Sequence, residues 1–264
     1  MTNDELRDKF NPEGSDLRNL QLRMLSILEE IDKICRDHGI DYWLTGGTLI
    51  GALRHGGFIP WDDDIDIKMT WEGYKKFLDV APRCLPSHLV IQTHDTDKYW
   101  FFRFGKVRDT RSQITELTGI DKFYKYKGAF VDIFPCGSYS KTLYTIAWFL
   151  QLNGLIRPAK YIPWKWFHTL LIGVYHIVGF IYGLFGKIEK LKHSKGVLNT
   201  YGTHNKYTDI PEDSVFPVKD ILFEGKRFLG PADADRYLRL FYGDYMQLPD
   251  IDKIETHALK IELD

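Results

Sequence analysis

Hydrophobic residues recur at helical spacing near the start of the chain, which predicts an amphipathic helix between Leu17 and Cys35. Gly39 follows the last apolar position and predicts the end of this helix. The apolar stripe needs a sheet or another helix to pack against. Its members are Leu17, Leu20, Met24, Ile27, Leu28, Ile31 and Cys35.

Beyond Gly39 the pattern changes repeatedly between strand-like and helical spacing. We expect strands over residues 40–44 and 62–69, a short helix over 49–54 and a longer one over 71–80. This mixture predicts an α+β fold, with a mixed sheet flanked by helices. Further strand candidates are residues 88–93, 99–107 and 128–134.

Two long uncharged runs, residues 142–156 and 166–186, occupy the middle of the chain. About 20 apolar residues can span a bilayer, but His168, His176 and four glycines make the second run a poor transmembrane helix. We expect an apolar helical insertion, either a hairpin in the membrane interface or a buried helical pair. Peripheral membrane contact would use aromatic and basic side chains, namely Trp164, Trp166, Tyr175, Tyr182, Arg157, Lys160, Lys165 and Lys187.

The composition is that of a folded protein and excludes disordered, collagenous and disulfide-rich classes. The 264 residues carry 35 basic and 36 acidic side chains, so nothing draws the whole chain to nucleic acid. Three widely spaced cysteines form no C-x-x-C motif, and the first residues include no apolar signal region. We therefore expect a cytoplasmic protein, either free or peripheral on the cytoplasmic face of the membrane.

Charge divides the chain into three segments: residues 1–136, 137–195 and 196–264. The middle segment has eight basic residues and one acid, a net charge of +7, while the formal charge of the whole chain is −1. The middle segment is therefore basic and apolar between two more acidic parts.

An acidic cluster lies in the predicted strand over residues 62–69. Side chains alternate along a strand, so Asp62, Asp64 and Asp66 would share one face while Ile65 and Ile67 enter the core. Three neighbouring carboxylates repel one another, and a hard divalent cation, Mg²⁺ or Mn²⁺, would compensate them. The alternative is a solvated acidic loop, which would suit the first two aspartates alone.

Gly46 and Gly47 lie where the first strand turns into the next helix, fifteen residues before the acidic cluster. Backbone N–H groups there can approach a phosphate at the helix N-terminus, although two glycines are also ordinary turn residues. Asp132 is the only charged residue in the apolar run 128–135. It would be a third metal ligand, or else a structural turn or capping residue.

The unbroken stretch YWLTGGTLIGALRHGGFIPWDDDID, residues 42–66, resembles the signature of the LicD family of phosphorylcholine transferases. Fukutin-type phosphoryl-ribitol transferases share a related pattern within the nucleotidyltransferase superfamily. The resemblance extends to the strand around Asp132 and to residues 222–225, Pro231 and 242–245 near the end.

This resemblance implies metal-dependent transfer of phosphorylcholine, or a similar phospho-alcohol, from a CDP-linked donor such as CDP-choline. The acceptor would be a sugar hydroxyl of a cell-surface glycan, such as teichoic acid or lipopolysaccharide, carried on a lipid. Residues 1–136 would form a nucleotidyltransferase-like catalytic core, and 196–264 would complete the catalytic unit after the helical segment 137–195.

In this hypothesis Asp64 and Asp66 hold Mg²⁺ against the donor diphosphate, and Asp132 completes the site. Either Asp132 or Asp62 accepts the proton of the acceptor hydroxyl. Phosphate oxygens would lie against Gly46, Gly47 and Thr48.

Four basic residues are candidates for the donor phosphates. Arg54 and His55 follow the short helix and either add charge near the leaving group or are solvated at the surface. Lys106 and Arg108 share one strand face and either grip the phosphates or form an exposed basic edge. A choline group would need an aromatic cage, and the candidates Trp43, Trp61, Tyr99 and Trp100 could equally serve the core.

Other classes remain open. Asp62-x-Asp64 and Asp64-x-Asp66 both satisfy the D-x-D pattern of metal-dependent glycosyltransferases, and the donor could be CDP-ribitol or CDP-glycerol. A non-catalytic calcium-binding scaffold is the third class. The residues after Asp62 lack the Gly and Glu positions of an EF-hand loop.

Overall fold

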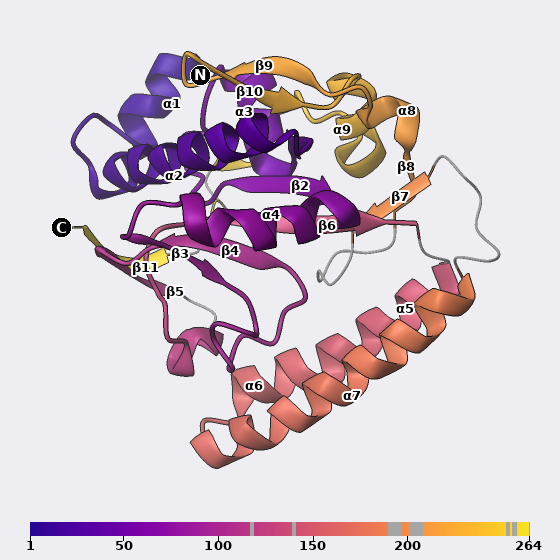
Figure 1. The fold of residues 1–264 in the computed structure, drawn as a ribbon. Helices are drawn as coiled ribbons and strands as arrows, with labels where there is room; N and C mark the ends of the chain where they lie inside the picture. The colour runs from indigo at the N-terminus through magenta and orange to yellow at the C-terminus, as the bar shows by residue number, and fades with distance from the viewer. Residues whose placement is uncertain are drawn as a thin grey trace.

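The computed structural model describes residues 1–116, 119–138, 141–189, 197–200, 208–251, 254 and 258–263. Figure 1 shows a body of helices and strands at the top and a long helical hairpin beneath it. The fold is α+β, with a mixed sheet flanked by helices, as predicted from the sequence.

The central sheet has the strand order β1-β2-β6-β4-β3. Neighbours β2 and β6 are parallel and the other pairs on this path are antiparallel. These strands are β1 (Tyr42–Leu44), β2 (Asp66–Thr70), β6 (Phe130–Gly137), β4 (Gly105–Asp109) and β3 (Leu89–Gln92). Short strands β7 (Val197–Thr200) and β8 (Ile210–Pro211) extend from β6, and two-stranded ribbons join β9 (Lys219–Phe223) to β10 (Lys226–Gly230) and β5 (Ser112–Glu116) to β11 (Ala258–Leu263).

One face of the sheet packs against α2 (Asp16–His38) and α4 (Trp71–Cys84). Ile67 and Val107 each lie between two charged residues along their strands, and both are buried in this core together with Ile133. Gly39 ends α2 with a φ of +58° in the left-handed region, as the sequence predicted. The remaining helices of the body are α1 (Asn3–Phe10), α3 (Gly46–His55), η1 (Ile120–Phe123), α8 (Glu212–Val215) and α9 (Ala234–Tyr242).

Several element boundaries differ from the sequence prediction. The strand predicted over residues 62–69 begins only at Asp66, and α3 begins at Gly46 instead of residue 49. Residues 99–104 are not in a strand, because consecutive rings there, Trp100 and Phe101 among them, are all buried. A strand would turn alternate side chains to opposite faces, whereas these rings enter one second core cluster.

The apolar middle segment forms a helical hairpin, residues 141–189, which runs along the lower side in Figure 1. Its first arm is α5 (Lys141–Gln151), a π-helical turn (Leu152–Ile156) and α6 (Arg157–Tyr161), and its second arm is α7 (Lys165–Glu189). Leu155, Ala159, Leu171 and Tyr175 pack into the second core cluster. Within the described residues, no helix is both long and apolar enough to cross a membrane.

Candidate functional site

The register of three neighbouring strands places charged residues side by side. Asp66 of β2 lies opposite Asp132 of β6, and Asp132 lies opposite Lys106 of β4. Because side chains alternate along strands, these residues and Lys68 share the face turned away from α2 and α4. We call this surface, made by Asp66, Lys68, Lys106 and Asp132, the carboxylate face.

Lys106 and Asp132 form a buried ion pair. The Lys106 Nζ atom lies 3.0 Å from Oδ1 and 3.2 Å from Oδ2 of Asp132, and 3.2 Å from the centre of the Phe130 ring. Both side chains are about one-tenth exposed or less. The attraction between the two charges opposes the large cost of removing them from water, which is expected to exceed the gain when no other group interacts with the pair.

The glycine turn and the acidic cluster are in direct contact. Gly46 has a φ of +58°, and a Cβ atom there would lie 2.6 Å from Asp66 Oδ2. A Cβ atom on Gly47 would lie 2.5 Å from Asp62 Oδ2. Glycine is therefore required for the N-terminus of α3 to approach both carboxylates. The hydroxyl of Thr48 accepts a hydrogen bond from the Asp66 backbone N–H at 2.8 Å.

The carboxylates of the acidic cluster repel one another. Burial, and then the neighbouring Asp64 carboxylate, raise the pKa values of Asp62 and Asp66 well above their usual range. Asp132 raises that of Asp66 further, while Lys106 opposes the shift. The Oδ2 atom of Asp62 is buried without a hydrogen-bond partner in the described structure.

These donor atoms fit a hard divalent cation in their chemistry, since all are carboxylate oxygens and one is unpaired. Within the described ranges, no three His, Cys, Asp or Glu side chains converge as a complete metal cluster. Asp132 is engaged by Lys106 in this arrangement.

Arg54 and His55 lie at the other end of α3 from Gly46, about 12 Å away at the helical rise per residue. The His55 ring is held between Asn3 Oδ1, 2.7 Å from Nδ1, and Arg54 Nε, 2.8 Å from Nε2. Burial, reinforced by Arg54, lowers the pKa of His55 to about 4, so the ring is uncharged at neutral pH. Arg54 donates to the Tyr245 carbonyl oxygen, and its charge partly opposes the rise in the pKa of Asp62.

Arg108 differs from Lys106 although both are buried on β4. Its guanidinium donates to Gln92 Oε1 at 2.5 Å and to the Gly128 carbonyl oxygen at 2.8 Å. It also lines a surface hollow of about 350 Å³ with Asp109 and Lys127. The structure therefore brings Lys106 to the carboxylates and gives Arg108 partners at the end of β3 and on the loop before β6.

Lys68 was not among the residues singled out from the sequence. Its buried Nζ atom donates to the Tyr237 hydroxyl at 3.0 Å and lies 4.7 Å from the Phe241 ring centre. Strand alternation could have revealed Lys68, which lies two positions after Asp66. Tyr237 on α9 carries no such local signal.

Another α9 residue, Tyr242, also lies near the carboxylates. Partial burial and the nearby Asp66 carboxylate raise the pKa of Tyr242 to about 12. The C-terminal segment therefore contributes side chains to the site.

The aromatic residues considered for a choline cage have packing partners. The Trp43 Nε1–H donates to the Tyr237 hydroxyl at 3.3 Å, and the Trp100 Nε1–H to the Phe104 carbonyl oxygen at 2.7 Å. Trp61 packs edge-on against the ring of Phe10. These contacts are those of core residues.

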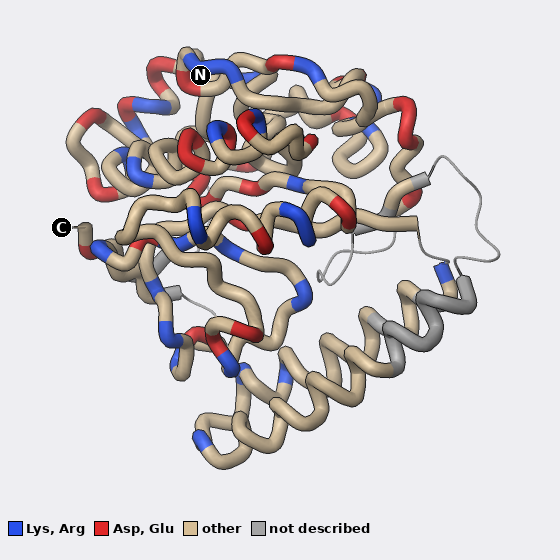
Figure 2. The backbone as a smooth tube through the Cα atoms, viewed as in Figure 1, with Lys and Arg blue, Asp and Glu red and all other residues tan. Residues whose placement is uncertain are grey.

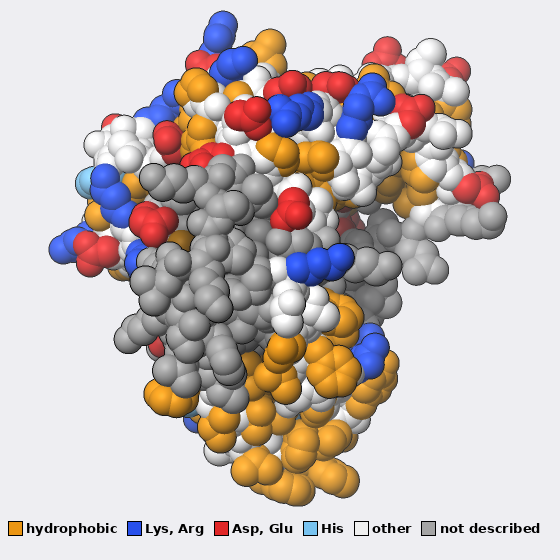
Figure 3. All heavy atoms as spheres, turned by 90° about the vertical axis from the view of Figure 1, so that its right-hand side faces the viewer, with side chains coloured by type: hydrophobic (Ala, Val, Ile, Leu, Met, Phe, Trp, Pro, Cys, Tyr) orange, Lys and Arg blue, Asp and Glu red, His pale blue; other side chains and the backbone are white. Residues whose placement is uncertain are grey.

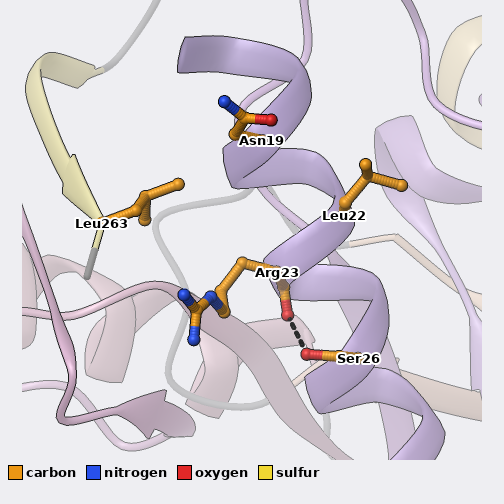
Figure 4. Close-up of a pocket in the computed structure, with 5 residues that line it drawn as sticks. All are labelled: Asn19, Leu22, Arg23, Ser26 and Leu263. Atoms are coloured by element: carbon orange, nitrogen blue, oxygen red, sulfur yellow. Dashed lines mark hydrogen bonds between the residues drawn. The ribbon is translucent and has the colours of Figure 1, made fainter. Parts of the chain in front are cut away.

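A larger hollow of about 490 Å³ lies between α2 and β11 (Figure 4). It is lined by Asn19, Leu22, Arg23, Ser26 and Leu263. Ser26 donates to the Arg23 carbonyl oxygen, and the Arg23 guanidinium forms an ion pair with Asp109. None of the residues of the carboxylate face lines this hollow.

Comparison with known proteins identifies the family. Residues 39–169 match the family described as LicD/FKTN/FKRP, nucleotidyltransferase domain. The chain is 30% identical to the lipopolysaccharide cholinephosphotransferase LicD of Haemophilus influenzae over 92% of this chain and 96% of that protein. It is also 62% identical to the human ribitol 5-phosphate transferase FKRP, over 13% of this chain and 7% of that protein.

A longer and weaker match joins the chain to the mouse ribitol-5-phosphate transferase FKTN, with 26% identity over 33% of this chain and 17% of that protein. The similarity to LicD extends over nearly the full length of both chains. The chain therefore belongs to the LicD family of transferases, as the signature over residues 42–66 predicted.

Proposed function

We propose that the protein transfers phosphorylcholine from CDP-choline to a sugar hydroxyl of a lipid-linked surface glycan of the lipopolysaccharide or teichoic acid type. The observation that carries this proposal is the alignment of Asp66, Asp132 and Lys106 across three strands, against the glycine N-terminus of α3. The near full-length similarity to a lipopolysaccharide cholinephosphotransferase supports the choice of donor and acceptor.

Asp64, Asp66 and Asp132 are the residues that would hold Mg²⁺ or Mn²⁺. Such an ion, when bound, neutralises charge on the donor diphosphate and on the departing CMP. The backbone N–H groups at Gly46 and Gly47 add the positive end of α3 on the same side. Lys106 supplies a second fixed positive charge beside Asp132.

We assign proton removal from the acceptor hydroxyl to Asp62. A general base needs a free oxygen within reach of the reacting hydroxyl. The Oδ2 atom of Asp62 is unpaired in the described structure, whereas both Asp132 oxygens lie close to Lys106 Nζ. Asp132 therefore serves the metal and the strand pairing, and Asp62 takes the proton.

CDP-ribitol is the competing donor, because a short stretch of the chain is similar to ribitol 5-phosphate transferases. A nucleotide-sugar donor would use the D-x-D spacing of the same aspartates. Transfer from CDP-choline or CDP-ribitol releases CMP, and transfer from a UDP-sugar releases UDP. The mass added to the glycan then distinguishes phosphorylcholine from ribitol phosphate.

The test is to incubate the full chain with CDP-choline, CDP-ribitol or a UDP-sugar, Mg²⁺ and a glycan extract, and to follow nucleotide release and the mass of the glycan. We expect CMP release from CDP-choline together with a phosphorylcholine addition to the glycan. Asp64→Asn and Asp66→Asn should each lower the rate by about 10³-fold or more, because the lost charge acts in the transition state.

Asp79→Asn makes the same chemical change at an exposed position of α4 and should leave the rate unchanged. Circular dichroism and the melting temperature should show that each variant is folded. Turnover of a UDP-sugar alone, or near-normal rates in both Asp64→Asn and Asp66→Asn, would overturn the proposal.

A further inference from the structure

The hairpin carries apolar side chains on both sides of α7. Its inner side, with Leu171, Tyr175 and Val178, is buried against the body. Its outer side, which we call the outer face of α7, consists of Trp166, Leu170, Ile177 and Phe180, all between 60% and 73% exposed. These residues follow one another at helical spacing and form a continuous apolar stripe.

Large exposed hydrophobic residues are concentrated on this hairpin. Within the described part of the chain, eight of the fifteen belong to residues 141–189. Figure 3 shows hydrophobic side chains gathered over the lower end of the molecule, where the hairpin lies. A contiguous patch of this kind marks an interaction surface, whereas single exposed apolar residues are ordinary.

The charges of the hairpin are mainly positive. Residues 141–189 contain five basic side chains and one acidic residue, Glu189, at the far end of α7 from Lys165. Figure 2 shows acidic and basic positions mixed over the body, in contrast to the largely uncharged hairpin. Lys160 and Lys165 flank the turn between the two arms, next to Tyr161, Trp164 and Trp166, which are 58% to 72% exposed.

We propose that the outer face of α7 docks on an anionic lipid bilayer, with the helix lying in the plane of the membrane surface. Tryptophan and tyrosine favour the interface because they combine apolar rings with polar N–H or O–H groups, and lysines attract anionic headgroups. A second copy of the chain would bring two basic hairpins together, so charge favours the lipid surface over self-association. Docking would hold the body beside lipid-linked molecules without a membrane span.

Contacts around Tyr175 attach α7 to the rest of the protein. The Arg103 guanidinium lies 3.7 Å above the Tyr175 ring and donates to the Tyr175 carbonyl oxygen at 2.5 Å. His94 stacks on the same ring at 3.9 Å. These contacts join α7 to the loops beside the sheet, so a docked hairpin positions the sheet relative to the bilayer.

The test is co-sedimentation of the full chain with vesicles of phosphatidylcholine alone or with added phosphatidylglycerol, at low and high salt. We expect binding to the anionic vesicles that weakens at high salt, with a blue shift of tryptophan fluorescence. Leu170→Glu should weaken binding more than tenfold. Leu222→Glu is the matched control, because Leu222 on β9 is 59% exposed and Leu170 is 60% exposed.

Lys160→Glu with Lys165→Glu should remove most of the preference for anionic vesicles. Equal binding by the Leu170→Glu and Leu222→Glu variants would overturn the proposal. Failure of the wild-type chain to bind the vesicles would also overturn it. Light scattering would then show whether the outer face of α7 forms a dimer that Leu170→Glu dissociates. Because binding is measured without turnover, this test is independent of the proposed donor and acceptor.

Discussion

The carboxylate face buries charged side chains, whereas the outer face of α7 exposes large apolar ones. Asp132 and Lys106 are charged and nearly inaccessible, while Trp166 and Phe180 are apolar and about two-thirds exposed or more. Folding alone favours neither arrangement, because burying charge and exposing large apolar rings both cost free energy. The proposed metal site and the proposed lipid contact would each offset the cost of one of these arrangements.

The two regions also differ in how they are held. The carboxylate face depends on strand register and on a glycine turn, so its atoms are fixed by the backbone of the core. The outer face of α7 depends on one helix whose inner side is packed. We therefore expect substitutions in the first region to affect folding and chemistry together, and those on the outer face to spare folding.

Removing one partner of the buried ion pair is expected to have the largest effect on stability. Lys106→Met leaves the Asp132 carboxylate without its nearest cation, which should lower the free energy of unfolding by about 3–5 kcal/mol. Urea unfolding followed by circular dichroism measures this. Added Mg²⁺ should stabilise the variant more than the wild type, since the freed carboxylate can then bind the ion.

Lys106→Met combined with Asp132→Asn is the informative control for this prediction. The double variant carries no unpaired buried charge and should be more stable than Lys106→Met alone. Lys75→Met, at an exposed position of α4, should change stability by less than about 0.5 kcal/mol. A cost below about 1 kcal/mol for Lys106→Met would mean that the pair is not desolvated in solution.

Two adjacent leucines of α7 test whether the hairpin is packed on one side only. Leu171 is 3% exposed and Leu170 is 60% exposed. Leu171→Ala should destabilise the protein by about 2–4 kcal/mol because it leaves a cavity, whereas Leu170→Ala should cost less than about 0.5 kcal/mol. Thermal or urea unfolding of both variants makes the comparison, and similar losses would contradict an unpacked outer face.

Local patterns explain which parts of the fold could be predicted. The period of α2 and its end at Gly39 are properties of neighbouring residues, and both were predicted correctly. Residues 99–104 were predicted wrongly as part of a strand, since a run of rings can be buried on all sides without alternating. The pairing of Asp66 with Asp132 joins strands far apart in the chain. The sequence suggested Asp132 as a third metal ligand, but the register of the two strands could not be predicted from local patterns.

The same distinction applies to the candidate site. Lys106 and Arg108 lie two positions apart on the same strand face, so the sequence does not distinguish them. In the structure Lys106 pairs with Asp132, and Arg108 pairs with Gln92. Tyr237 reaches Lys68 from a helix 169 positions later. Neither assignment follows from composition or spacing, because both depend on how distant elements pack.

The glycine turn is expected to change stability less than the ion pair or the packed side of α7, and a matched pair of variants isolates its role. Gly46 and Gly39 both have a φ of +58°, so alanine at either position should cost about 1–2 kcal/mol of backbone strain. Only at position 46 would the new Cβ approach a carboxylate, at 2.6 Å from Asp66 Oδ2, while position 39 has open space. Gly46→Ala should therefore lower the rate of CMP release at least tenfold, and Gly39→Ala should leave the rate near that of the wild type.

Urea unfolding of the two variants measures the backbone strain, and initial rates of CMP release measure the effect of displacing the Asp66 carboxylate. Equal activity of the two variants would mean that the contact between α3 and Asp66 has no part in the chemistry.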